Sequence, residues 1–303
     1  MGEQAGRRVS LVLGSGGARG LAHIGIIQRI EEQGYRIESI SGASMGALVG
    51  GIYAAGELGT FRDWAYALSR ADVLRFLDFA FSAGGLFRGD RIMETLKAMV
   101  GEHAIEDLPI AYTAVATDID RQREVWISQG PLFDAIRASI AVPTVFTPHH
   151  YLGLTLVDGG LLNPVPIAPT FRDRTDLTIA VNLHGEARPP ERPLQRAKRQ
   201  ALAPPKVDLV SRIRQFLDTA GEGSDQPGPA DLGMLELVTR SFETMQNAIA
   251  AVKLAAYAPD AVIQVPRDAC GVHEFHRARE LIDLGYRLAG ESLASIRDPD
   301  RRG

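Results

Sequence analysis

The sequence of 303 residues contains a single cysteine, Cys270, so no disulfide can form within the chain. This fits a reducing compartment. The sequence also lacks an excess of basic residues, because 33 Lys and Arg stand against 37 Asp and Glu, for a net charge of −4. No overall positive field would draw such a protein onto nucleic acid or an anionic membrane. We therefore predict no nucleic-acid partner, and we expect any contact with a membrane surface to be local and transient.

Long hydrophobic runs are missing too. No segment reaches the roughly 18 to 20 apolar residues of a membrane-spanning helix. The apolar stretch near the N-terminus is too short for a secretory signal and runs directly into a glycine-rich segment. We expect a cytoplasmic protein, peripheral at most at the inner face of the membrane. The histidines lack His-x-x-x-His spacing with a carboxylate partner, so we predict neither a metal site nor a cofactor.

The residues that are present predict an α/β protein. A hydrophobic fraction of 45% can fill a large core. Short apolar runs alternate with helical patterns, an order typical of a mainly parallel sheet covered by helices. We predict a three-layer sandwich with this sheet at its centre. The predicted strands are 9–13, 37–41, 110–117, 124–128, 154–157, 177–182 and 261–265, and the predicted helices are 20–33, 45–55, 91–100, 132–139, 232–256 and 274–288.

The stretch from about 185 to 230 breaks this alternation with clustered prolines and many basic residues. One interpretation is a mobile, solvated segment. The other is a basic amphipathic lid that touches lipid headgroups, with an apolar side formed by Val207, Leu209, Val210, Ile213, Phe216 and Leu217. We favour the first, and we predict one domain over 1–303 with an insertion or mobile loop at about 185–230.

A candidate nucleophile lies in the segment 42–46, Gly-Ala-Ser-Met-Gly, between a predicted strand and a predicted helix. In this context Gly-x-Ser-x-Gly forms a nucleophile elbow. The serine occupies a strained turn for which glycine neighbours leave room, and its hydroxyl stands clear of the sheet. The pattern alone would also suit a structural turn, so the context carries the hypothesis that Ser44 is a nucleophile.

A second glycine-rich segment, 14–20, follows the first predicted strand and opens the first helix. Backbone N–H groups at such a place bind a negative charge, either a phosphate or the oxyanion of an acyl intermediate. A dinucleotide-binding loop would need glycine at the sixth position from Gly14, where Arg19 stands, and no Gly-Lys-Ser/Thr follows as in a P-loop. These departures favour an oxyanion loop.

A candidate base is Asp158, which ends a predicted strand and is followed by Gly159 and Gly160. Asp-Gly pairs are also common in plain turns. A carboxylate with an ordinary pKa of about 4 is a weak base towards a serine hydroxyl, so this role requires that burial raise the pKa.

Four blocks in the same order resemble the patatin-like phospholipase family, in particular bacterial members related to the catalytic domain of neuropathy target esterase. They are the loop 14–20, the elbow 42–46, the Ala-Ser-x-x-x-Pro block 138–143 and the Asp-Gly-Gly block 158–160. The resemblance covers at least residues 9 to 185. The loop departs from the family pattern with Gly14 and Ser15 where Asp and Gly are common.

The resemblance implies hydrolysis of a lipid ester, with Ser44 as nucleophile and Asp158 as proton acceptor, through an acyl-enzyme and without a histidine. It also implies an oxyanion hole from the N–H groups of Gly16, Gly17, Ala18 and Arg19. The glycines that would shape these blocks are Gly14, Gly20, Gly42, Gly46, Gly159 and Gly160.

Three alternatives stay open. A Ser-His-Asp triad would draw on one of His149, His150, His184, His273 and His276. An acyltransferase would use the same first half-reaction, and a non-catalytic protein would bind lipid or regulate a partner. The apolar residues of 76–87 would either line an acyl-chain pocket or serve as ordinary core.

Overall fold

A computed structural model describes residues 6–73, 89–143, 145–187 and 234–297. The apolar segment 76–87 and the proposed lid residues between 207 and 217 lie outside the described residues. The chain divides into two compact units, 1–188 with 240–303, and 189–239. The prediction of one domain with an insertion stays a prediction. All contacts discussed below belong to the first unit.

An eight-stranded sheet forms the centre of this unit. Its strands are hydrogen-bonded in the sequence β5-β6-β3-β2-β1-β7-β8, with β6 and β2 following each other along one edge of β3 and β4 on the other edge. The parallel part comprises β1 (Arg8–Leu13), β2 (Arg36–Ala43), β3 (Ala111–Asp118), β7 (Leu177–Gly185) and β8 (Ala261–Pro266). The antiparallel part comprises β4 (Arg123–Ile127), β5 (His149–Tyr151) and β6 (Leu154–Asp158). The predicted mainly parallel sheet is confirmed, although the short strand β5 was not predicted.

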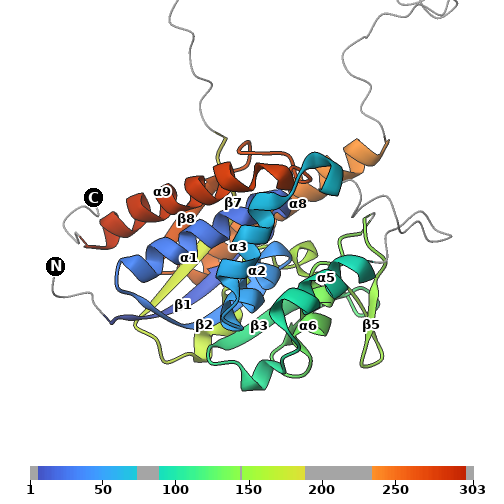
Figure 1. Cartoon of the computed structure of the whole chain (residues 1–303), viewed down its shortest axis with the longest axis horizontal. Helices are drawn as coiled ribbons and strands as arrows, with labels where there is room; N and C mark the ends of the chain where they lie inside the picture. The colour runs from blue at the N-terminus through green and yellow to red at the C-terminus, as the bar shows by residue number, and fades with distance from the viewer. Residues whose placement is uncertain (1–5, 74–88, 144, 188–233, 298–303) are drawn as a thin grey trace, which may run out of the picture. The chain divides into compact units, whose positions relative to one another are not determined.

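Helices cover both faces of the sheet, which confirms the predicted three layers (Figure 1). The described helices are α1 (Ala22–Glu32), α2 (Met45–Ala54), α3 (Leu58–Ala67), α5 (Asp90–Val100), α6 (Leu132–Ser139), α8 (Met234–Tyr257) and α9 (Ala278–Arg297). The predicted helix 20–33 begins later, because Gly17–Leu21 forms a 3-10 helix, η1. The helix predicted at 274–288 begins at Ala278 and continues to Arg297, and α3 was not predicted.

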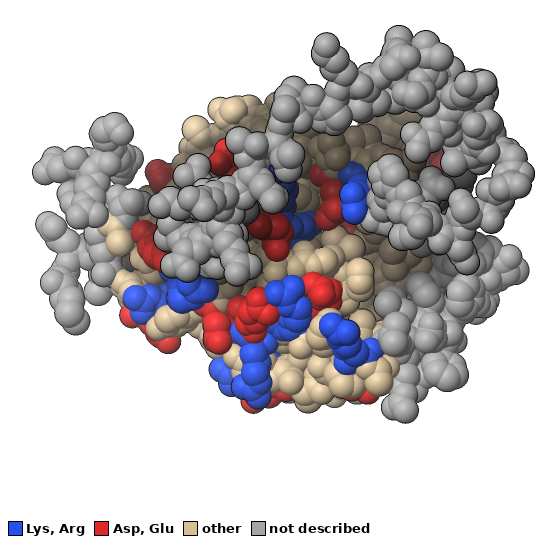
Figure 2. All heavy atoms as spheres, turned by 90° about the horizontal axis from the view of Figure 1, so that it is seen from above, with Lys and Arg blue, Asp and Glu red and all other residues tan. Residues whose placement is uncertain are grey.

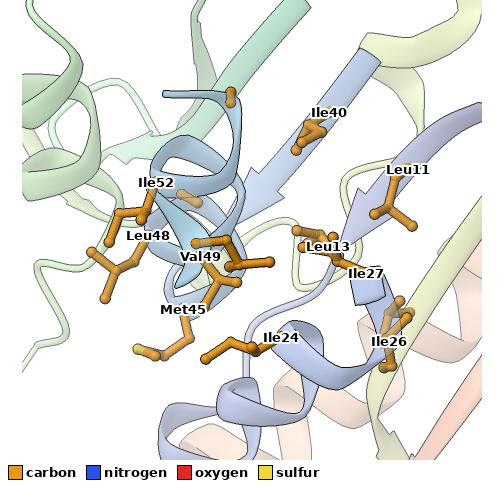
Figure 3. Packing of buried hydrophobic residues seen from close by; sticks show 14 of the residues in the cluster. Leu11, Leu13, Ile24, Ile26, Ile27, Ile40, Met45, Leu48, Val49 and Ile52 are labelled. Atoms are coloured by element: carbon orange, nitrogen blue, oxygen red, sulfur yellow. The ribbon is translucent and has the colours of Figure 1, made fainter. Parts of the chain in front are cut away.

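Alternation along β1 explains how one strand serves two layers. Leu11 and Leu13 point into the large core shared with α1, α2 and α9, whereas Val12 points into a smaller core with Ala250 of α8. Figure 3 shows the first of these cores, where side chains from α1 and α2 meet those of β1 and β2. Strands buried on both faces explain the nearly continuous apolar runs in the sequence.

Two glycines let α1 and α9 approach each other closely. A Cβ atom on Gly25 would collide with the carbonyl oxygen of Ile282, and one on Gly285 would collide with that of Ala22. The helices therefore meet backbone to backbone, which anchors the C-terminal helix beside the helix that follows the glycine-rich loop.

The described surface carries both signs of charge. Figure 2 shows Lys and Arg side chains lying beside Asp and Glu side chains on one face of the molecule. No helix among the described residues is both long and apolar enough to cross a membrane.

Candidate active site

Ser44 lies in a strained turn between β2 and α2. Its backbone has φ 55° and ψ −124°, a combination that side chains rarely adopt and that costs about 1–3 kcal/mol. A Cβ on Gly42 would lie 2.5 Å from the carbonyl carbon of Gly46, and one on Gly46 would collide with the carbonyl oxygen of Leu13. Only glycine fits at both places. Ser44 itself is 5% exposed.

The glycine-rich loop lies directly beside this turn. It connects β1 to η1 (Gly17–Leu21). A Cβ on Gly20 would collide with the side chain of Met45, and the carbonyl oxygen of Gly14 lies 2.9 Å from the Cβ position of Gly46. The two glycine-rich segments predicted from the sequence therefore touch through their glycines.

Some N–H groups of the loop are already paired: Gly14 with the Val181 carbonyl at 3.1 Å, Ser15 with that of Pro164 at 2.8 Å, and Ala18 with that of Val272 at 2.9 Å. The predicted oxyanion donor Ala18 is therefore not supported, since its N–H is donated elsewhere. In a 3-10 helix that begins at Gly17, the N–H of Arg19 is directed back at the carbonyl of Gly16. The N–H groups of Gly16 and Gly17 have no acceptor among the described residues.

The Arg19 side chain holds the loop in place. Its guanidinium is almost fully buried and donates to the carbonyl of Gly16 at 3.2 Å, the carbonyl of Arg267 at 2.6 Å and the carboxylate of Glu243 at 2.8 Å. The planar fork of arginine suits three acceptors in fixed directions. The loop is thereby tied to the end of β8 and to α8.

Asp158 is the last residue of β6 and is 1% exposed. Its Oδ1 accepts a hydrogen bond from the N–H of Gly160, and Oδ2 has no partner at ordinary hydrogen-bonding geometry among the described residues. Burial raises the pKa of this carboxyl to about 7, while hydrogen bonding from the Ser44 hydroxyl and from the Gly160 N–H opposes the rise. The Ser44 hydroxyl therefore lies close enough to affect this pKa without an ordinary hydrogen bond to Oδ2.

The sheet brings Ser44 and Asp158 together through β3. Val115 of β3 pairs with Ala43, the last residue of β2, and the next residue, Ala116, pairs with Asp158. Because β4 occupies the other edge of β3 over this stretch, β2 and β6 must share one edge and run towards each other. Their C-terminal ends, which carry Ser44 and Asp158, therefore meet.

Two buried histidines lie near the loop. Nε2 of His23 lies 2.9 Å from the Gly14 carbonyl oxygen, and Nε2 of the buried His184 has no hydrogen-bond partner among the described residues. Burial lowers the pKa of each to about 4, so both are neutral near pH 7. No hydrogen bond joins either ring to Ser44. The described residues contain no group of three or more His, Cys, Asp and Glu placed to hold a metal ion.

Residues from distant parts of the chain complete the site, and the sequence patterns did not single them out. Gln246 of α8 donates to Oγ of Ser15 at 3.3 Å, and both side chains occupy the space where a Cβ on Gly160 would lie. Glu243, one turn earlier, pairs with Arg19. Nothing local marks these two residues within an ordinary helical pattern, because their role depends on where α8 lands.

This chain is similar to a family model and to several known proteins. A family model described as patatin-like phospholipase matches residues 11–171. An NTE family protein of Mycobacterium tuberculosis is 41% identical, over 97% of this chain and 93% of its own length. Lysophospholipase NTE1 of Pyricularia oryzae is 30% identical over 97% of this chain, which corresponds to 19% of that protein. The crystal structure of VipD from Legionella pneumophila aligns with 94% of this chain and 67% of its own, with 15% identity and a TM-score of 0.43.

Proposed function

The chain belongs to the patatin-like phospholipase family, and from this premise we propose that it hydrolyses carboxylic esters of lipids through a dyad of Ser44 and Asp158. The observation that carries this proposal is the meeting of two groups at the ends of β2 and β6. One is a serine in a strained elbow, and the other is a buried carboxyl whose pKa is raised to about 7. A base with a pKa near the working pH combines ionisation with sufficient basicity.

In the proposed first step, Oγ of Ser44 attacks the ester carbonyl carbon while Asp158 takes the hydroxyl proton. The tetrahedral intermediate collapses as Asp158 passes that proton to the departing alcohol, which leaves an acyl group on Ser44. In the second step Asp158 takes a proton from water, the resulting hydroxide attacks the acyl carbon, and the proton returns to Ser44. The carboxylic acid is released and the enzyme is restored.

The oxyanion of each intermediate would be bound by the free N–H groups of Gly16 and Gly17. Both lie at the N-terminal end of η1, and their loop touches the elbow. Fixed donors of this kind stabilise developing charge without reorganisation, and removal of one typically costs about 3 kcal/mol of barrier. The Arg19 side chain serves this step indirectly, because its hydrogen bonds hold the loop.

We propose a lysophospholipid or related lipid ester as substrate, since a lysophospholipase is among the similar proteins. Contact with a lipid surface would be local and transient, because the chain has a net charge of −4 and both signs of charge are interspersed (Figure 2). The proposed location is the cytoplasm or its membrane face.

The test compares wild type, Ser44→Ala and Asp158→Asn on a medium-chain p-nitrophenyl ester and on a lysophospholipid, with circular dichroism as the check on folding. Ser41→Ala is a matched control, since Ser41 lies on β2 three residues before Ser44 and its buried Oγ has no partner among the described residues. We expect both dyad variants to lose activity by orders of magnitude and Ser41→Ala to retain it.

Wild-type rates in either folded dyad variant would contradict the proposal. An inert wild type that still reacts with a fluorophosphonate at Ser44 would point instead to transfer of the acyl group to an acceptor other than water. An inert and unreactive wild type would favour a lipid-binding role.

A further inference from the structure

The turn that carries Ser44 is hydrogen-bonded to a residue that takes no part in the proposed chemical steps. The backbone N–H of Ser44 donates to Oγ of Ser139 at 2.9 Å, and Oγ of Ser139 donates in turn to the carbonyl of Val115 at 2.6 Å. Ser139 is the last residue of α6 and is fully buried. Its hydroxyl thus bridges the turn that carries Ser44 to the middle strand β3.

The same short segment also holds the other member of the dyad. Two residues after Ser139, the carbonyl of Ala141 accepts the backbone N–H of Asp158 at 2.9 Å. One stretch of chain, 139–141, therefore receives the N–H of the residue at each strand end. The distance between Ser44 and Asp158 depends on this stretch as well as on their pairing with β3.

We infer that Ser139 is a positioning residue of the ester-hydrolysing site, which fixes the backbone of Ser44 in its strained conformation and so aims Oγ at Asp158 and at the substrate carbonyl. This inference rests on the proposed function. A strained backbone persists only where its surroundings determine it, and the N–H of Ser44 is the group through which Ser139 does so.

The bridge has a further consequence for the oxyanion. Because the N–H of Ser44 is already donated to Ser139, it is not free to bind the developing negative charge. The oxyanion would therefore be bound by the glycine-rich loop alone. The Ser44 N–H positions the nucleophile, and the N–H groups of the loop bind the oxyanion.

Removal of the Ser139 hydroxyl leaves the N–H of Ser44 buried without a partner and frees the turn to relax. A displacement of about 1 Å at a reacting atom can lower a rate about 100-fold. For Ser139→Ala we expect kcat to fall about 10- to 100-fold, with KM within about twofold and the apparent pKa of kcat/KM unchanged, because the Ser139 hydroxyl is hydrogen-bonded to the backbone of Ser44 and Val115 and not to the Asp158 carboxyl. Ser139→Thr keeps the hydroxyl and should recover most of the loss.

The experiment measures kcat per active site, with sites counted by fluorophosphonate titration, for wild type, Ser139→Ala, Ser139→Thr and the control Ser41→Ala. The rate of fluorophosphonate labelling should fall in parallel with kcat in Ser139→Ala alone. Wild-type kcat and labelling rate per titrated site in Ser139→Ala, even with a lower unfolding temperature, would show that the hydroxyl only stabilises the fold and would overturn the inference.

The two proposals fail in different ways. Full activity in Ser44→Ala would defeat the proposed function itself. Dependence on Ser44 together with indifference to Ser139 would defeat only the positioning role. Failure of Ser139→Thr to recover activity where Ser139→Ala has lost it would also count against the hydroxyl as the active feature, provided that circular dichroism shows both variants folded.

Discussion

Oδ1 of Asp158 accepts a 2.7 Å hydrogen bond from the backbone N–H of Gly160, two residues further along the chain. This bond favours the ionised carboxylate, yet burial outweighs it and raises the pKa to about 7. The carboxyl is therefore fixed in direction by its own turn and made basic by its surroundings, which is the combination that a serine-activating base requires.

The first prediction concerns the pH dependence of activity. Asp158 accepts a proton only when ionised, so kcat/KM should rise with pH through a single ionisation with a midpoint near 7 and then level off. An imidazole base would give a similar midpoint. The two differ in the enthalpy of ionisation, which is near zero for a carboxyl and large for an imidazole. Profiles recorded at several temperatures should show a midpoint that scarcely moves, and a strong shift would indicate a histidine.

The second prediction concerns stability. The unfolded chain loses the Asp158 proton near pH 4 while the folded protein keeps it up to about pH 7, so stability falls as pH rises across this window, by about 1.4 kcal/mol per unit and about 4 kcal/mol at most. Asp158→Asn removes this cost. Urea unfolding should show it more stable than wild type at pH 8, with a difference that shrinks towards pH 4.

Asp176→Asn provides a control of opposite sign. The hydrogen bonds from Arg8 lower the pKa of Asp176 to about 2, so its contribution is present above about pH 4 and is lost below it. This variant should be slightly less stable than wild type at pH 8. A destabilised Asp158→Asn at pH 8 would contradict the raised pKa.

The third prediction concerns the contact between α1 and α9. Gly25→Ala would place a methyl group against the Ile282 carbonyl and should lower the free energy of unfolding by about 1–3 kcal/mol or more. Gly59 of α3 has open space at its Cβ position, so Gly59→Ala should be neutral or stabilising by up to about 1 kcal/mol. Chemical denaturation compares the two, and equal effects would rule out the close approach.

The fourth prediction concerns Arg19. Lysine cannot reach three acceptors at once, so Arg19→Lys should lower kcat about tenfold by loosening the loop that carries Gly16 and Gly17. Glu243→Gln should lower kcat by less, because the Glu243 side chain is 32% exposed and the amide oxygen of the introduced glutamine can still accept a hydrogen bond from Arg19. Steady-state kinetics with a matched measurement of unfolding temperature tests this order. An Arg19→Lys variant as active as wild type would show that the loop needs no such clamp.

Much of the fold followed from patterns that act locally. Alternating apolar runs and helical periods predicted the mainly parallel sheet and its two helical layers, because burial on both faces leaves a strand few polar positions. The short strand β5 and the 3-10 helix η1 escaped prediction, since their form depends on pairing with β6 and on contacts of the loop rather than on their own residues.

The candidate site divides in the same way. Ser44, Asp158 and the glycines beside them could be selected from the sequence. A strained turn and close backbone contacts require glycine as a neighbour, so these glycines form a pattern that can be recognised in the sequence. The sequence could not predict the raised pKa of Asp158 or the hydrogen bond from the Ala18 N–H to the Val272 carbonyl. It also could not predict the ion pair of Glu243 with Arg19 or the hydrogen bond from the Ser44 N–H to Ser139. Each depends on burial and on segments far apart in the chain, and only the tertiary structure brings those together.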